Sequence, residues 1–395
     1  MRVYADNAAT TKLSPAAKEA MLPYFDEIYG NPSTLYTLGQ EAAEHLLACR
    51  TEIAQLIGAA DPREIVFTSG GSEADNQAII SAARNGARKG KKHLISTKFE
   101  HHAVLHTLDK LRKEGFDVTL LDVHENGVVR VEDVAAAIRD DTALVSVMFA
   151  NNEIGTIQPI EAIGALCRER GIPFHTDAVQ AVGHVPVDVQ AMHIDLLSCS
   201  AHKFHGPRGV GFLYARRGIP LTNIIEGGAQ ERGKRGGTEN TPAIAGMAAA
   251  LREAVDHMAE NTEKVTRLRE TLIAGLSTIE HARLNGDREQ RVPGTVNFCF
   301  EGIRASRCCS CSTARASPLH PAAPAPPARS TPAMCCWPSA CRTRSPRLGA
   351  AVAVRHNTEE DVDYILEKLP EIVSTLRSMS PLWEQIQKGQ IHYDI

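Results

Sequence analysis

The feature that most constrains this fold is a repeated alternation of short apolar strands with helical segments over its first half. Strand-like runs cover 65–68, 92–97, 118–121 and 144–149, with two more from Phe174 and from Ile194. Repeated strand–helix units predict a mostly parallel sheet with helices on both faces. Ligands bind such sheets beyond the carboxyl ends of the strands. We therefore expect an α/β fold with its functional site at that edge.

Polar residues stand just past several of these strands. They are Ser72, His101, Asn152, Asp177 and Lys203. A single polar residue in such a place is commonplace, and His101 alone could be a satisfied loop histidine. Five chemically matched residues at one edge of a sheet indicate a shared site.

Lys203 lies on a short turn after a strand, among small and hydroxylated residues. A lysine in a dry pocket loses its proton more easily and can then form a Schiff base. A lone lysine after a strand is usually a solvated surface residue, and Asp177 alone could be a turn or cap residue. Together, a Schiff-base lysine and an aspartate that pairs with a pyridinium nitrogen are typical of a pyridoxal phosphate (PLP) site.

A glycine-rich turn, Ser69-Gly70-Gly71-Ser72, joins the first strand to a helical stretch that we expect from Asp75. Free backbone N–H groups and the positive end of a helix would face one point there, which favours an anion such as phosphate. The alternative is an ordinary helix N-cap at Ser72. The same groups can serve both purposes.

The length of 395 residues allows two packed domains. We expect a large domain over 14–258 and a small domain made of 1–13 plus 259–395. The net charge of −4 suggests neither a nucleic-acid nor an acidic-membrane partner. No apolar run is long enough to cross a membrane, and the first residues lack the apolar core of a secretory signal. These observations predict a cytoplasmic protein.

Seven motifs occur in an order that is highly specific. They are Asp6-Asn7-Ala8-Ala9-Thr10-Thr11, Gly30-Asn31-Pro32-Ser33, Glu100-His101, Asn151-Asn152-Glu153-Ile154-Gly155, His175-Thr176-Asp177-Ala178-Val179-Gln180, Ser200-Ala201-His202-Lys203 and Arg235-Gly236-Gly237-Thr238. With them the chain resembles the cysteine desulfurases of the iron–sulfur-cluster and nitrogen-fixation type, which are class V aminotransferase-like enzymes. The resemblance covers about 1–303 and 355–395. It departs at Gly71-Ser72, where the family often has Ala-Thr, and at Tyr36, where it often has His.

The resemblance implies a fold-type-I PLP-dependent transferase, with a large, mostly parallel sheet domain and a smaller α+β domain. It implies removal of sulfur from L-cysteine, which gives L-alanine and an enzyme persulfide for iron–sulfur cluster assembly. The implied partners are a second copy of the chain in a homodimer and a scaffold or other sulfur-acceptor protein. A selenocysteine lyase, a PLP aminotransferase and an inactive PLP-binding remnant remain as alternatives.

The resemblance also implies roles for single residues. Lys203 would hold PLP covalently and move protons, while His101 would stack on the ring and take part in acid–base chemistry. Asp177 would pair with the ring nitrogen. Other residues would bind the ring oxygen or the substrate amine (Asn152, Gln180), the phosphate (Gly71, Ser72, Ser200, His202) or the phosphate of the partner subunit (Thr238).

Residues 304–354 do not fit this pattern. The stretch contains seven Arg, no acidic residue, no Ile or Phe, and abundant Pro and Ala. Such a composition predicts disorder. The stretch holds six of the ten cysteines, but the spacing of Cys308, Cys309, Cys311, Cys335 and Cys336 matches no standard metal site, and no metal is expected.

A reading-frame error explains this stretch better. The family has here a sequence like Gly-Ser-Ala-Cys-Thr-Ser-Gly-Ser-Leu-Asp-Pro-Ser-His. GC-rich codons for it, read one base late, give the sequence found from Ala322 to Met334. Ala325 then stands where the family has its persulfide-forming cysteine, and an arginine that binds the substrate carboxylate, expected near residue 350, is lost as well. We therefore expect the chain as written to keep the PLP half of the site and to lack the sulfur nucleophile.

Overall fold

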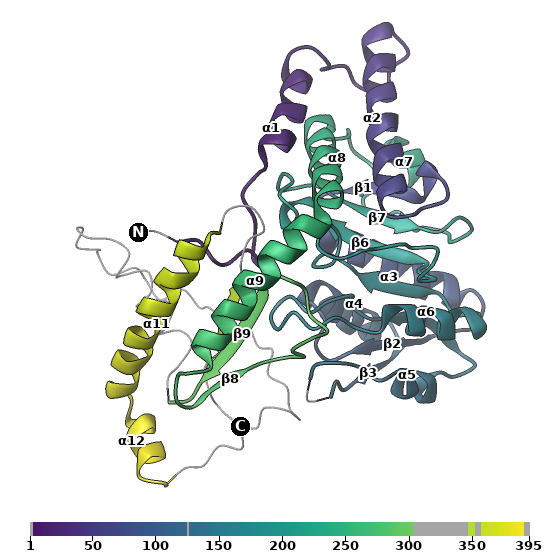
Figure 1. Ribbon diagram of the computed structural model, residues 1–395. Helices are drawn as coiled ribbons and strands as arrows, with labels where there is room; N and C mark the ends of the chain where they lie inside the picture. The colour runs from purple at the N-terminus through teal and green to yellow at the C-terminus, as the bar shows by residue number, and fades with distance from the viewer. Residues whose placement is uncertain (1–2, 125, 303–346, 352–356, 391–395) are drawn as a thin grey trace. The chain divides into compact units, whose positions relative to one another are not determined.

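The computed structural model describes residues 3–124, 126–302, 347–351 and 357–390. The chain divides into two compact units (Figure 1). The large unit comprises Ala9–Asn152 and Thr156–Glu260, and the small unit comprises Met1–Ala8, Glu153–Gly155 and Asn261–Ile395. In the described part of the chain, every helix is too short or too polar to cross a bilayer.

The large unit is built on a seven-stranded sheet with the order β1-β7-β6-β5-β4-β2-β3. Strands β3, β2, β4, β5 and β6 run parallel to one another, whereas β7 is antiparallel to both β1 and β6. This confirms the expected α/β fold with a mostly parallel sheet. The strands are β1 (Ile65–Thr68), β2 (His93–Thr97), β3 (Asp117–Leu121), β4 (Thr142–Ser146), β5 (Phe174–Asp177), β6 (Leu196–Ser200) and β7 (Gly211–Ala215).

Helices of the large unit pack on this sheet and beside it (Figure 1). The central helix α3 contacts β1, β4, β5, β6 and β7, and its small residues Ala74, Ala78 and Ala82 are buried against Val66, Leu144 and Leu213. Small side chains four residues apart allow the helix to lie close to the sheet. The helices and 3₁₀ turns are α1 (Pro15–Met21), η1 (Leu22–Phe25), α2 (Thr37–Leu56), η2 (Pro62–Glu64), α3 (Gly71–Ala87), α4 (His102–Lys113), α5 (Val131–Ala137), α6 (Ile160–Glu169), η3 (Ala201–Lys203), α7 (Gln230–Gly233) and α8 (Thr241–Asp256).

Several element boundaries differ from the expectation, two of them by three residues or more. Helix α3 begins at Gly71, four residues before the expected Asp75, and the residue in its N-cap position is Gly70. The expected strand 144–149 is observed as β4, Thr142–Ser146. Beyond β4 the backbone still bonds to β5, since Val147 N donates to His175 O and Phe149 N donates to Asp177 O. The apolar run therefore continues past the regular strand.

The small unit contains a three-stranded antiparallel sheet with the order β10-β9-β8. Its elements are β8 (Ala282–Leu284), β9 (Thr295–Phe300), β10 (Arg347–Ala351), α11 (Glu359–Ser378), α12 (Pro381–Gln387) and most of α9 (Met258–Leu276). Leu272, Phe298, Phe300, Val362 and Val373 lie in its apolar core. Strand β10 falls inside the stretch 304–354, for which we expected disorder. The remainder of that stretch lies outside the described residues.

Candidate functional site

The carboxyl ends of β5 and β6 bring Asp177 and Lys203 to the same edge of the sheet. Asp177 is the last residue of β5 and pairs in parallel register with Ser198 of β6. Lys203 ends η3, the turn that follows β6 directly. Its ammonium group donates a hydrogen bond to the carbonyl oxygen of Ala9, with Nζ and O 3.1 Å apart. The half-buried lysine therefore sits at the sheet edge where the sequence predicts the site.

The Asp177 carboxyl is buried and has charged neighbours. Its Oδ1 accepts a hydrogen bond from Val179 N at 3.0 Å. Burial raises the pKa of Asp177, while this hydrogen bond and the positive charges of His101 and Lys203 oppose the rise. A buried carboxyl group of this kind favours a cationic partner, because its own charge is costly without one.

His101 occupies the N-cap position of α4. Its Nδ1 accepts a hydrogen bond from Ala103 N at 3.1 Å, so the neutral ring carries its proton on Nε2. Desolvation lowers the pKa of His101, the Asp177 charge opposes this, and nearby cationic groups add to the lowering. A ring nitrogen of His101 and one carboxyl oxygen each of Asp177 and Asp75 lie within 4.8 Å of one another. The sequence analysis singled out His101 and Asp177 but missed Asp75, which it treated only as the start of a helix.

A cavity of about 360 Å³ opens at the N-terminus of α3. Its lining residues are Thr10, Ser69, Gly70, Gly71, Ser72, Glu73, Ser200, His202, Arg208 and Gly209. Four predicted phosphate-binding residues, Gly71, Ser72, Ser200 and His202, therefore meet around one space. Thr10, Glu73 and Arg208 join them without having been singled out as binding residues.

The turn that forms this cavity requires glycine. Gly70 has φ +149°, a conformation that residues with a side chain rarely adopt, and a Cβ on Gly71 would lie 2.6 Å from Val179 Cγ2. No side chain caps α3 with a hydrogen bond from its N-cap position. An ordinary N-cap at Ser72 is therefore ruled out, because Ser72 is the second residue of the helix. Backbone N–H groups at an uncapped helix N-terminus suit an anion.

His202 and Arg208 also line this cavity. His202 Nδ1 lies 3.1 Å from Thr10 Oγ1, and the His202 carbonyl oxygen accepts hydrogen bonds from Thr11 N and Thr11 Oγ1. Desolvation, together with the charges of Lys203 and Arg208, lowers the pKa of His202 to about 4. His202 is therefore neutral at pH 7 and offers a hydrogen bond, while the exposed Arg208 supplies positive charge.

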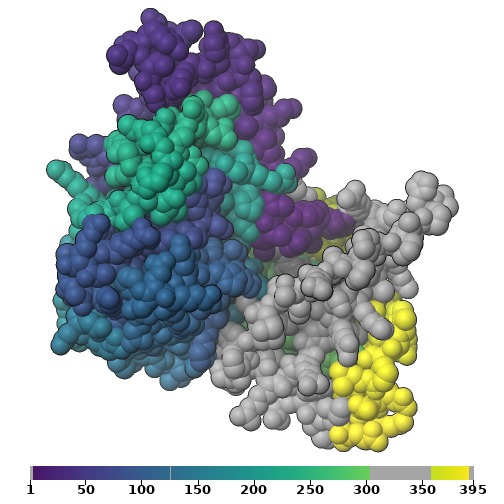
Figure 2. Space-filling model, turned by 180° about the vertical axis from the view of Figure 1, so that it is seen from behind, coloured from purple at the N-terminus to yellow at the C-terminus, as the bar shows by residue number. Residues whose placement is uncertain are grey.

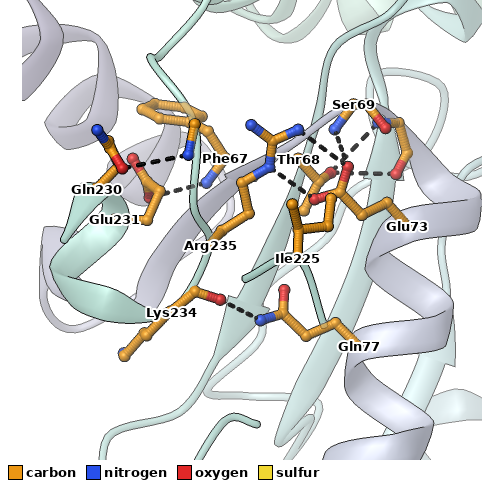
Figure 3. A network of polar contacts seen from close by, with 12 residues as sticks. Phe67, Thr68, Ser69, Glu73, Gln77, Ile225, Gln230, Glu231, Lys234 and Arg235 are labelled. Atoms are coloured by element: carbon orange, nitrogen blue, oxygen red, sulfur yellow. Dashed lines mark hydrogen bonds and ion pairs between the residues drawn. The ribbon is translucent and has the colours of Figure 1, made fainter. Parts of the chain in front are cut away.

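Glu73 connects the glycine-rich turn to Arg235 through a hydrogen bond and an ion pair (Figure 3). Glu73 Oε2 accepts a hydrogen bond from Ser69 N at 2.8 Å, and Arg235 Nε donates to Glu73 Oε1 at 2.9 Å. One helical turn further along α3, Gln77 Nε2 donates a hydrogen bond to Lys234 O at 2.7 Å. Burial alone would raise the pKa of Glu73, but the hydrogen bonds from Arg235 and Ser69 hold it below its usual value. Glu73 therefore bridges the cavity and the loop that contains Arg235.

The remaining predicted residues lie in turns and loops. Asn152 and Gln180 are half-buried and follow β4 and β5 along the chain. Thr238 is exposed and is not among the residues that line the cavity of its own chain.

Comparison with known proteins gives a consistent result. The chain matches the family described as "Aminotransferase class-V" over residues 3–313. It is 47% identical over 406 aligned positions to a protein named cysteine desulfurase IscS from Clostridium botulinum, covering 98% of each chain. It is 45% identical to a protein of the same name from Methanosarcina thermophila, covering 96% of this chain and 94% of that one.

Solved structures agree with these sequence matches. A structure described as a NifS-like protein superimposes with a TM-score of 0.85 at 35% identity, covering 95% of this chain and all of that one. A structure described as SspA in complex with cysteine superimposes with a TM-score of 0.69 at 36% identity, covering 80% of this chain and 88% of that one.

Proposed function

This chain belongs to the class V aminotransferase family, among its cysteine desulfurases, and from that membership we propose that its site is built to take sulfur from L-cysteine and leave L-alanine, a reaction that also needs the reading frame of 304–354 to be intact. The observation that carries the proposal is the meeting of Lys203, Asp177 and His101 at one sheet edge, in the unit that also holds the cavity at the N-terminus of α3. The sulfur would pass to a thiolate of the enzyme and then to an acceptor protein of iron–sulfur cluster assembly.

The chain's residues fit PLP, the cofactor on which this family depends. The cavity offers uncapped helix N–H groups, Ser200, neutral His202 and the positive charge of Arg208, a set suited to a phosphate. The buried Asp177 suits a protonated ring nitrogen. When bound, PLP supplies an electron sink that makes the α-proton of an amino acid acidic.

The protein's own groups then have distinct tasks. We assign to Lys203 the attachment of the cofactor and the movement of a proton at its Nζ. We assign to His101 a position on the face of the cofactor ring, with its Nε2 giving a hydrogen bond or transferring a proton, since Nδ1 already accepts a hydrogen bond from Ala103 N. Asn152 and Gln180 orient the ring oxygen or the substrate amine. Thr238 of the partner subunit completes the phosphate site.

Sulfur transfer needs a thiolate nucleophile, and the described cysteines do not supply one. Cys167, Cys199 and Cys299 are buried, and Cys49 is partly buried. Burial raises the pKa of Cys49 to about 11 and that of Cys167 to about 12, and it raises the pKa of Cys199 as well. These three thiols stay protonated at pH 7, and a thiol is a poor nucleophile.

The family resemblance implies a persulfide-forming cysteine in the stretch 304–354, most of which lies outside the described residues. We propose that the chain as written lacks it, because Ala325 stands at its position, and that the reading frame of the gene is displaced across this stretch. Such a chain would be a PLP-binding remnant of a desulfurase. In the complete enzyme the cysteine Cβ–S bond breaks, the sulfur joins the enzyme thiolate as a persulfide, and the Cβ takes up a proton to give alanine.

Three polypeptides test this proposal. The first is the chain as written, the second has the reading frame restored across 304–354, and the third is the restored chain with its regained cysteine changed to alanine. We expect alanine and sulfide from L-cysteine with dithiothreitol only for the second, while Lys203→Ala in that chain removes turnover and the visible absorbance of covalently bound PLP. Robust turnover by the chain as written would show that the nucleophile has been misplaced. A restored chain that processes selenocysteine or transaminates, and leaves L-cysteine untouched, would contradict the desulfurase assignment.

We further propose that the chain works as a homodimer. Seven of the ten large apolar side chains that are exposed among the described residues fall between residues 22 and 47. They are Leu22, Phe25, Tyr29, Leu35, Tyr36, Leu38 and Leu47, which we call the 22–47 patch. Figure 2 shows this part of the chain, in purple, at one end of the large unit. Monomers rarely expose so many apolar side chains in one segment, so the patch suits an interface with a second copy.

A further inference from the structure

The carboxyl group of Asp75 is buried close to the predicted site residues Asp177 and His101, and the sequence analysis assigns it no role. Asp75, on the first turns of α3, is 1% exposed. Its Oδ1 accepts no hydrogen bond from the described residues. One carboxyl oxygen of Asp75 lies within 4.8 Å of a carboxyl oxygen of Asp177 and of a ring nitrogen of His101. A buried, incompletely bonded carboxyl beside a second one costs folding energy, which calls for an explanation.

The histidine beside Asp75 does not compensate its charge. His175 Nε2 lies 3.6 Å from Asp75 Oδ1. The two ring nitrogens of His175 already have partners, since Nδ1 lies 2.8 Å from Ser146 Oγ and Nε2 lies 3.0 Å from Ser198 Oγ. Burial lowers the pKa of His175 to about 3, so its ring is neutral at pH 7. The pair is therefore no salt bridge, and an ionised Asp75 would have no counter-charge from this side.

Besides His175, the titratable groups around Asp75 are His101 and two carboxyls, Asp177 and Glu100. Burial raises the pKa of Asp75 well above its usual value, and the charges of Asp177 and Glu100 raise it further, against a hydrogen bond with Ser198. Glu100 is itself buried; its Oε1 accepts hydrogen bonds from Thr97 Oγ1 and Met148 N, and its pKa rises to about 8. Three buried carboxyls this close cannot all be charged.

Asp177 is the member of the cluster best placed to hold the single charge. It accepts a hydrogen bond from the Val179 backbone N–H. Lys203 and His101 also favour its anion, whereas the charges that act most on Asp75 are those of the carboxylates Asp177 and Glu100. The surroundings thus favour the charged form of Asp177 and the neutral form of Asp75, as happens for carboxyl pairs that share one proton.

We propose that Asp75 is a positioning residue of the cofactor site that remains an uncharged carboxylic acid and thereby leaves the negative charge of the pair on Asp177. The inference rests on the proposed function, since Asp177 meets the cofactor and Asp75 acts only through it. An uncharged Asp75 keeps the floor of the site close-packed and bonded to Ser198. Because Asp75 is then uncharged, it does not repel the negative charge of Asp177, which stays available for a cationic ring nitrogen.

The isosteric variant Asp75→Asn tests the proposal, because an amide imitates a neutral acid but never a carboxylate. We expect the full chain with Asp177→Asn to bind PLP about tenfold more weakly than the parent, or by about 1.4 kcal/mol, and the full chain with Asp75→Asn to lose clearly less affinity than that. PLP affinity is measured by fluorescence titration. Loss of affinity in Asp75→Asn equal to that in Asp177→Asn would overturn the proposal.

A second measurement needs no cofactor and stands apart from the proposed function. An acid whose pKa is higher in the folded than in the unfolded chain lowers stability as pH rises above its unfolded value, about 4. Asp75→Asn removes this loss. Urea unfolding between pH 4 and pH 8 should therefore show a stability difference between variant and parent that grows with pH in favour of the variant. Parallel pH profiles would show that Asp75 is ionised in the folded chain and would overturn the proposal, whether or not the chain binds PLP.

Discussion

His175 shows how burial alone can set the charge of one side chain in this protein. Its side chain is 0% exposed, and desolvation lowers its pKa from 6.5 to about 3. A histidine with a depressed pKa stabilises the folded chain fully above pH 6.5, and this contribution is lost as pH falls toward the folded pKa. At 1.36 kcal/mol per pH unit, the loss is roughly 3–5 kcal/mol.

We therefore predict that His175→Gln flattens the acid branch of the stability profile. The free energy of unfolding of the parent chain should fall steeply between pH 6.5 and pH 4, while that of the variant falls less, whatever its stability at pH 7. Urea titrations monitored by circular dichroism measure both slopes. His257→Gln is the matched control, because His257 is exposed and its removal should leave the slope unchanged. Equal slopes in His175→Gln and the parent would contradict the prediction.

At the scale of the element, the ion pair between Glu73 and Arg235 connects the start of α3 with the loop that precedes α8. Glu73 is 7% exposed and Arg235 is 22% exposed, so neither is a freely hydrated surface charge. Removing Arg235 leaves a poorly hydrated carboxylate next to the phosphate cavity, which both loosens the turn at Ser69 and repels an anion.

Arg235→Gln should accordingly weaken PLP binding about tenfold, or about 1.4 kcal/mol, and Arg235→Lys should weaken it less, since a lysine keeps the charge but loses the second donor. Fluorescence titration gives both affinities. Arg252→Gln is the control, because the pair of Arg252 with Glu52 is 41% and 33% exposed and such surface pairs contribute little. An affinity of Arg235→Gln no lower than that of Arg252→Gln would count against this role.

The elements also show what could be predicted from the sequence. The strand Ile65–Thr68 and the edge position of Asp177 follow from short apolar runs that end in polar residues, a local signal. Asp75 and Glu73 gave no such signal, since Asp75 reads only as the start of a helix and Glu73 as a polar residue just before it. Their roles depend on what the fold places against them from β5 and from the Arg235 loop. Distant partners of this kind are invisible to periodicity.

At the scale of the whole molecule, the proposed homodimer depends on the 22–47 patch. Leu35 is 90% exposed and Phe25 is 65% exposed, so neither contributes much to the core of its own chain. Hydrophobic surface buried by a second copy would stabilise a dimer by roughly 25 cal/mol for each Å² of apolar area removed from water. A charge placed there is buried without a partner on association, and in the free monomer it is simply hydrated.

The double variant Leu35→Asp with Phe25→Asp should therefore have the mass of one chain in light scattering after size exclusion, where the parent has the mass of two. Its far-ultraviolet circular dichroism should match that of the parent, because both side chains are exposed in the single chain. Met379→Asp is the control: Met379 is 60% exposed but lies outside the patch, so this variant should remain dimeric. Because Thr238 of the partner subunit is proposed to complete the phosphate site, the monomeric variant should also bind PLP several-fold more weakly. A double variant that stays dimeric would place the interface elsewhere, and a monomeric one with unchanged PLP affinity would show that each chain holds the phosphate by itself.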